Sequence, residues 1–201
     1  MNSRTLMLVV GLAVLAAAGL GWMQFSESDQ PAGNLSGASV GGPFTLIDQD
    51  GKSINDKAFA GHYRLMYFGY TFCPDVCPTD VAVIAKGLKA YEISRPERAA
   101  KVVPIFVTVD PERDNPAALK AFVTAFHPRL VGLTGTPAQI GPVLKAFGIY
   151  ARKVPGSDPQ NYLVDHFAVN YLFGPDGRPI AFLPHGATAA DMTAMLETYV
   201  R

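Results

Sequence analysis

Cys73 and Cys77 are the two cysteines of the chain, and three residues separate them. Two cysteines cannot build a disulfide framework, and a pair this close is more often metal-binding or redox-active than structural. Both belong to the stretch 69–80, Gly-Tyr-Thr-Phe-Cys-Pro-Asp-Val-Cys-Pro-Thr-Asp, in which a proline follows each cysteine. A proline-containing turn at the start of a helix is a poor place to bury sulfur. The pattern therefore predicts thiolate chemistry, either metal binding or disulfide exchange.

The residues around the cysteines predict a strand, a turn and a helix. Leu65–Phe72 is nearly all apolar and aromatic, as in a strand that is buried on both faces. Apolar residues then recur at helical spacing from Val81 to Tyr91. Pro78 suits the first position of this helix, with Cys77 as its N-cap residue. The cysteines are thus expected at the carboxyl end of a strand, where α/β sheets usually bind ligands, and the helix dipole should favour the Cys77 thiolate.

The rest of the chain predicts an α/β domain with a mixed central sheet. Residues 44–54 alternate apolar and polar side chains around an Asp-Gly pair, which predicts a β-hairpin at the start of the domain. A second hairpin is predicted from 167–173 and 180–183, and a final helix begins at the capping-box residues Thr188 and Asp191. With the strands and helices between them, this order is that of the thioredoxin class, in which helices flank a mixed sheet.

The N-terminus predicts a transmembrane anchor. Residues 6–23 are an uninterrupted run of apolar and small side chains, about 27 Å long as a helix. Arg4 precedes the run, and no Lys or Arg follows before Lys52, so the positive-inside rule places the remaining chain outside the cytoplasm. A cleaved signal peptide is the alternative, since residues 16–18 are alanines suited to processing. We therefore expect three parts: an anchor or signal peptide at 1–23, a flexible tether at 24–42 and a folded domain at 43–201.

The charge balance of the chain argues against one class of partner. The 201 residues include 17 Lys and Arg and 17 Asp and Glu. A protein that binds nucleic acid or an anionic surface through its charge needs an excess of positive side chains. We therefore expect no nucleic-acid partner, and we attribute membrane contact to the apolar N-terminal segment.

The chain from about Pro43 to its C-terminus resembles the SCO/SenC family of copper chaperones, which belong to the thioredoxin superfamily. The resemblance rests on four motifs: Gly-Tyr-Thr-Phe-Cys-Pro-Asp-Val-Cys-Pro at 69–78, Val-Asp-Pro-Glu-Arg-Asp at 109–114, Gly-Leu-Thr-Gly at 132–135 and Tyr-Leu-Val-Asp-His at 162–166. The cysteine motif together with a downstream Asp-His pair is highly specific, whereas either alone is weaker.

The resemblance implies that Cys73, Cys77 and His166 bind copper. The expected oxidation state is Cu(I), and binding of Cu(II) as well is left open. It also implies a protein anchored in the bacterial inner membrane by a single span, with its domain in the periplasm. A copper donor protein would load the site. The client would be the copper-bearing subunit of cytochrome c oxidase, whose binuclear copper centre the family helps to assemble.

The residue types support this implied site. Two thiolates and an imidazole suit Cu(I), a soft ion that accepts sulfur ligands. Zinc is the alternative metal, although a structural zinc site normally has four protein ligands. Asp165 is expected to orient or tune the neighbouring imidazole, as carboxylates near metal ligands do. Two positions depart from the family pattern: Phe72 stands where a histidine is often found, and Phe167 where Ser or Thr commonly follows the Asp-His pair.

Two enzymatic alternatives use the same cysteines. A membrane-tethered thiol-disulfide reductase would cycle Cys73 and Cys77 through a disulfide, which three intervening residues do not prevent. A peroxiredoxin-like peroxidase would need a cation beside its cysteine, for which Arg129 and Arg152 are the candidates.

We interpret each remaining histidine as structural unless another feature links it to the cysteine pair. His62 lies in a polar stretch, and His127 follows a predicted helix, where a positive charge is favourable. His185 ends a predicted strand and is the candidate for an auxiliary group near the site. His166 alone would also be interpreted as structural, and its pairing with the cysteine motif is what makes it a predicted ligand.

Overall fold

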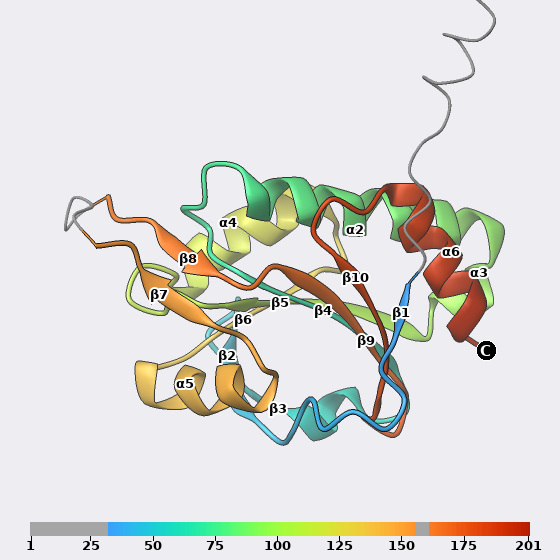
Figure 1. Ribbon diagram of the computed structural model, residues 1–201, viewed down its shortest axis with the longest axis horizontal. Coiled ribbons are helices and arrows are strands. Elements are labelled where there is room, and N and C mark those ends of the chain that lie inside the picture. Colours follow the sequence, from blue (N-terminus) through green and yellow to red (C-terminus); the bar gives the residue numbers. More distant parts are fainter. Residues whose placement is uncertain (1–31, 156–160) are drawn as a thin grey trace, which may run out of the picture. The chain divides into compact units, whose positions relative to one another are not determined.

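The computed structural model describes residues 32–155 and 161–201 (Figure 1). Within them the chain forms an eight-stranded sheet with the order β1-β10-β9-β4-β5-β6-β2-β3, and a separate pair, β7 and β8. The strands are β1 Gly33–Asn34, β2 Thr45–Asp48, β3 Ser53–Asn55, β4 Tyr63–Gly69, β5 Val102–Thr108, β6 Val131–Thr134, β7 Ala151–Lys153, β8 Val164–His166, β9 Val169–Phe173 and β10 Pro179–Pro184. Parallel and antiparallel pairs occur in one sheet, as predicted.

Strands β4 and β5 form the buried centre of the sheet. All seven residues of β4 are buried, which agrees with its continuous apolar sequence. Pro104 lies inside β5, in register with Leu65 of β4. Strand β6 pairs only with Ile105–Val107, so the missing N–H of Pro104 interrupts no ladder on that side. Gly69 ends β4 beneath Cys77, where a Cβ would lie 2.9 Å from the Cys77 sulfur.

Helices cover both faces of this sheet (Figure 1). Helices α2, α4 and α6 lie on one face, and α5 lies on the other. Asn115 caps α4 by accepting the Ala118 N–H at 3.0 Å, and α6 begins with the predicted Thr188 and Asp191 capping box. The helices are η1 Asp56–Phe59, α2 Val76–Ser94, α3 Pro96–Ala99, α4 Pro116–Phe126, α5 Pro137–Ala146 and α6 Ala189–Tyr199.

The folded domain begins earlier than Pro43, which corrects the predicted tether. Strand β1 pairs with β10, and the Leu35 N–H donates to the Ile180 carbonyl at 2.9 Å. Gly41 N–H likewise donates to the carbonyl of Ala146. A Cβ on Gly33 would lie 2.1 Å from the Phe182 ring, so glycine at this position permits close packing of β1 against β10.

The predicted N-terminal hairpin is confirmed, whereas the predicted anchor is not described. Strands β2 and β3 pair antiparallel around Gly51, whose φ of +77° suits glycine. None of the helices in residues 32–155 and 161–201 is long and apolar enough to cross a membrane. The predicted anchor at 1–23, and residues 24–31 of the predicted tether, lie outside the described residues.

Candidate metal centre

Three donor atoms from two distant segments meet beside the carboxyl end of β4. Cys73 lies in the loop after β4, Cys77 lies in the first turn of α2, and His166 is the last residue of β8. Cys77 Sγ lies 3.3 Å from His166 Nε2, and all three donor atoms lie within 4.8 Å of one another. The described part of the chain contains no second such group of three His, Cys, Asp or Glu side chains. The structure thus brings the predicted ligands together.

Helix α2 begins at Val76, so the predicted N-cap at Cys77 is two residues late. Asp75 is the N-cap residue, and Pro78 lies within the first turn, where backbone N–H groups have no helical acceptor. Cys77 is consequently inside the helix and fully buried. Its backbone N–H points back to the preceding loop and donates to Cys73 Sγ at 3.4 Å.

The two thiols differ in exposure and in proton affinity. Cys73 is half-buried, whereas Cys77 has no exposed surface. The hydrogen bond from the Cys77 thiol, and more weakly one from His166, lower the pKa of Cys73 well below its ordinary value. The same contact with Cys73, together with burial, raises the pKa of Cys77. The Cys73 sulfur is therefore both the more accessible of the two and the one that loses its proton more readily.

Tyr67 and Tyr70 form aromatic walls around His166. Both rings stand edge-on to the imidazole, with interplanar angles of 85° and centroid separations of 6.4 and 5.9 Å. The Tyr70 hydroxyl also accepts the Val164 N–H at 3.2 Å, which holds β8 against the cysteine loop. Nothing in the order of residues shows that β8 returns beside these tyrosines, so the sequence alone does not identify them as part of the site.

The loop after β5 holds the chain as it enters β8. The Tyr162 hydroxyl donates to Asp110 Oδ1 at 2.7 Å, and Arg113 Nε donates to Asp110 Oδ2 at 2.5 Å. The Arg113 guanidinium lies 3.7 Å from the centre of the Tyr162 ring, which favours a cation–π contact. Residues 109–114 are one of the four motifs shared with the family, and in the structure they fix the segment that carries His166.

Asp114 joins this loop to the cysteine loop. The carboxylate is fully buried and accepts hydrogen bonds from Thr71 Oγ1 at 2.6 Å, Thr71 N at 3.0 Å and Thr108 Oγ1 at 2.7 Å.

Asp114→Ala should lower the free energy of unfolding by about 3 kcal/mol, because three donors lose their acceptor. Urea denaturation measures this change in the free energy of unfolding. Asp50→Ala, which removes an exposed ion pair with Lys120, should leave the midpoint nearly unchanged, and equal midpoint shifts would contradict the prediction.

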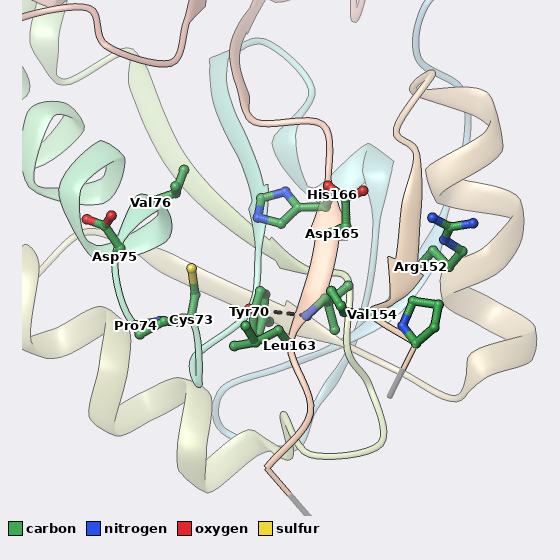
Figure 2. A pocket seen from close by; sticks show the side chains of 12 residues that line it. Tyr70, Cys73, Pro74, Asp75, Val76, Arg152, Val154, Leu163, Asp165 and His166 are labelled. Carbon is green, nitrogen blue, oxygen red and sulfur yellow. Dashed lines mark hydrogen bonds between the residues drawn. The ribbon is translucent and has the colours of Figure 1, made fainter. Parts of the chain in front are cut away.

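Among the described residues, Asp165 makes no hydrogen bond that would orient the imidazole. It is exposed, and because it precedes His166 in β8 the two side chains point to opposite sides of the strand (Figure 2). His166 Nδ1 is buried and has no hydrogen-bond partner among the described residues. The ring is therefore positioned by its aromatic contacts with Tyr67 and Tyr70 and by the contact of Nε2 with Cys77 Sγ.

The other histidines have separate partners. His127 is buried with Nε2 3.4 Å from a Glu92 carboxylate oxygen, and His62 Nδ1 lies 3.3 Å from a backbone carbonyl. His185 Nδ1 lies 2.9 Å from an oxygen of Asp80, a buried residue one turn after Cys77. His185 thus reaches the helix that carries Cys77 without joining the donor group.

A pocket of about 420 Å³ opens over Cys73, and His166 faces it from the opposite wall (Figure 2). Arg152, one of the two cations considered for a peroxidase, also lines this pocket. Arg129, the other, binds Glu92 at 2.5 Å near the amino end of β5, away from the cysteines. The pocket gives a solvent route to Cys73, whereas Cys77 lies behind it.

Comparison with known proteins gives a family match over nearly all the described residues. The SCO1/SenC family model matches residues 32–201. An SCO2-like protein of Rickettsia prowazekii is 41% identical over 140 residues, which are 69% of this chain and 66% of that protein. The matches span between 42% and 66% of the length of the first three curated relatives.

Solved structures agree with this match. Bradyrhizobium japonicum ScoI, solved with copper bound, is 43% identical with a TM-score of 0.71, and the match covers 80% of this chain and 99% of that one. BsSco, described as a Sco-family cytochrome c oxidase assembly protein with a disulfide switch, is 28% identical with a TM-score of 0.64, covering 80% and 94%. A thioredoxin domain of a Bacteroides vulgatus thiol-disulfide oxidoreductase has a TM-score of 0.54 at 18% identity over 81% and 96%, which supports the thioredoxin-like fold alone.

Proposed function

Because the chain belongs to the SCO1/SenC family, we propose that it binds copper through Cys73, Cys77 and His166 and delivers it to the copper-bearing subunit of cytochrome c oxidase. The supporting observation is that these donors, from segments 89 residues apart, lie within 4.8 Å of one another. A metal with bonds of about 2.3 Å to sulfur bridges donors up to about 4.6 Å apart, so only a small side-chain rotation is needed. Two sulfurs and an imidazole favour Cu(I).

The difference between the thiols suggests the order of binding. Cu(I) meets the Cys73 thiolate first, because that sulfur is half-exposed and carries the lowered pKa. Cys77 must then lose its proton to become a ligand, so copper replaces the proton between the two sulfurs. Asp165, although turned away, adds negative charge near the bound cation. Release runs in reverse, with ligands of the acceptor approaching from the side of Cys73.

The test is to titrate the reduced 201-residue chain with Cu(I) against a colorimetric chelator. We expect one equivalent to be retained, and we expect it to move to the metal-free, reduced copper-bearing domain of the oxidase on mixing. Failure to retain copper would contradict the proposal. Thiol counts in the same mixtures report on the alternative function.

That alternative, a thiol-disulfide reductase, is favoured by one observation: the half-exposed Cys73 has the buried Cys77 thiol directly behind it. The Cys73 thiolate would attack a substrate disulfide, forming a mixed disulfide and expelling one substrate thiolate. Cys77 would then displace the second, which leaves the substrate with two thiols and the protein with a Cys73–Cys77 disulfide. Loss of two protein thiols on mixing with the oxidised oxidase domain, without copper transfer, would favour this function.

We also propose that residues 1–23 anchor the chain in the bacterial inner membrane as a single span, with residues 24–31 as the remaining tether and the domain in the periplasm. The support is the apolar run at 6–23 with Arg4 on its amino side. A copper donor protein would then load the site from the periplasmic side, where the copper-bearing subunit would also have to meet it.

A further inference from the structure

Exposed large hydrophobic side chains gather at the candidate metal centre. Five are exposed in the described part of the chain. Three of them belong to the segments that carry the donors, and a fourth, Tyr150, directly precedes β7, the strand that pairs with β8. Phe72 precedes Cys73, Phe167 follows His166, and Leu163 lines the pocket. We call these four side chains the apolar collar: Phe72, 55% exposed, Tyr150, 50%, Leu163, 44%, and Phe167, 50%.

Backbone and ring contacts join members of the collar to one another and to the loop after β5. The Phe167 N–H donates to the Tyr150 carbonyl at 2.9 Å, which joins two of its members. The Arg113 guanidinium packs over the Phe72 ring, 4.9 Å from the ring centre. The fifth exposed side chain, Ile93, lies near the far end of α2 and belongs to no such group. Grouped apolar exposure of this kind is typical of a contact surface, whereas a single exposed side chain is ordinary.

The charges beside the collar are largely compensated. Arg113 is paired with Asp110 at 2.5 Å, and Lys153 is paired with Glu112 at 2.7 Å. The charged side chains that line the pocket are of both signs: Asp75, Arg152 and Asp165. A partner recognised here would therefore gain little from a strong charge of either sign.

Copper transfer requires that the acceptor protein contact the surface around Cys73. Copper passes between proteins when a ligand of the acceptor bonds to the ion before the donor's ligands leave, so the two sites must touch. Cys77 has no exposed surface, and Cys73 is reached through the pocket that Leu163 lines (Figure 2). An acceptor that reaches Cys73 must therefore lie over the side chains around it.

We propose that the apolar collar is the docking surface for the protein that accepts the metal, and that this protein presents an apolar, weakly charged face around its own copper ligands. The inference rests on the proposed function, because it takes metal delivery as given.

The test measures the second-order rate of copper transfer from the 201-residue chain to the reduced copper-bearing domain of the oxidase. The double variant Phe72→Ser with Phe167→Ser should transfer about 10-fold more slowly, because aromatic anchors dominate small contact surfaces. Ile93→Ser, which removes an exposed apolar side chain elsewhere, is the matched control and should transfer at the unsubstituted rate. Raising the salt concentration should change the rate less than about 2-fold.

Copper retention is measured on every variant first, so a loss of the metal site is not mistaken for a loss of docking. Because Phe72 also packs on Arg113, Phe167→Ser alone is tested and should slow transfer about 3-fold. Equal transfer rates for the double variant and the Ile93→Ser control would overturn the proposal that the collar is the docking surface, but would leave the proposed copper delivery standing. Absence of transfer by the unsubstituted chain would overturn the proposed function and the collar with it. Self-association or vesicle binding that the double variant abolishes, with transfer unchanged, would assign the collar to another occupant and overturn the proposal.

Discussion

Oxidation of Cys73 and Cys77 to a disulfide should weaken Cu(I) binding by at least about a thousandfold. A disulfide holds its sulfurs about 2 Å apart and leaves no thiolate on either residue. His166 would then be the one remaining donor of the three. In the structure neither cysteine forms a disulfide, and the two sulfurs lie within 4.8 Å of each other. The site should therefore exist in two forms, one that holds copper and one that does not.

The measurement compares reduced and oxidised protein in competition with a Cu(I) chelator. Oxidised protein that has been reduced again is the control, and it should regain the full affinity. Alkylation gives an independent check: Cys73 should react first, because it is half-exposed and its pKa is lowered, and bound copper should protect it. If oxidised protein holds copper as tightly as reduced protein, or if copper fails to slow alkylation, the cysteine pair is not the site.

Features set by neighbouring residues could be predicted from the sequence. The Asp-Gly turn defines the hairpin of β2 and β3, and the Thr188 capping box starts α6 where expected. The start of α2 was misplaced because proline is tolerated throughout the first turn of a helix. Pro78 therefore identifies the turn but not the residue at which the helix begins. The consequence is chemical, since it moves Cys77 from the helix cap into the buried first turn.

Features set by distant residues could not be predicted in the same way. Strand β1 consists of two residues held by backbone hydrogen bonds to β10, and such a short edge strand needs no apolar pattern. The expected link from Asp165 to the imidazole was drawn from adjacency in sequence, yet alternation along a strand sends adjacent side chains apart. Tyr67 and Tyr70 contact His166 instead, from a strand and loop about 100 residues earlier in the chain.

His166→Ala should weaken copper retention about 100-fold while leaving Cu(I) capture intact. The remaining two sulfurs still suit Cu(I), but the vacated coordination position is open to competing thiols. Retention is therefore measured during titration with glutathione rather than in buffer alone. His62→Ala is the matched control, because His62 is exposed and contacts a backbone carbonyl, and it should retain copper as the unsubstituted chain does.

In His166→Ala, the loss of a copper ligand must be distinguished from a packing defect, because the imidazole packs edge-on against Tyr67 and Tyr70. Its removal leaves a gap that should lower the denaturation midpoint whether or not His166 is a ligand. His166→Met distinguishes the two roles: a thioether fills part of the gap and also binds Cu(I), so it should recover retention more than His166→Leu, which fills a similar volume without a donor. Equal retention by the Met and Leu variants, or equal losses in His166→Ala and His62→Ala, would remove His166 from the copper site and leave the two sulfurs as its only ligands among the described residues.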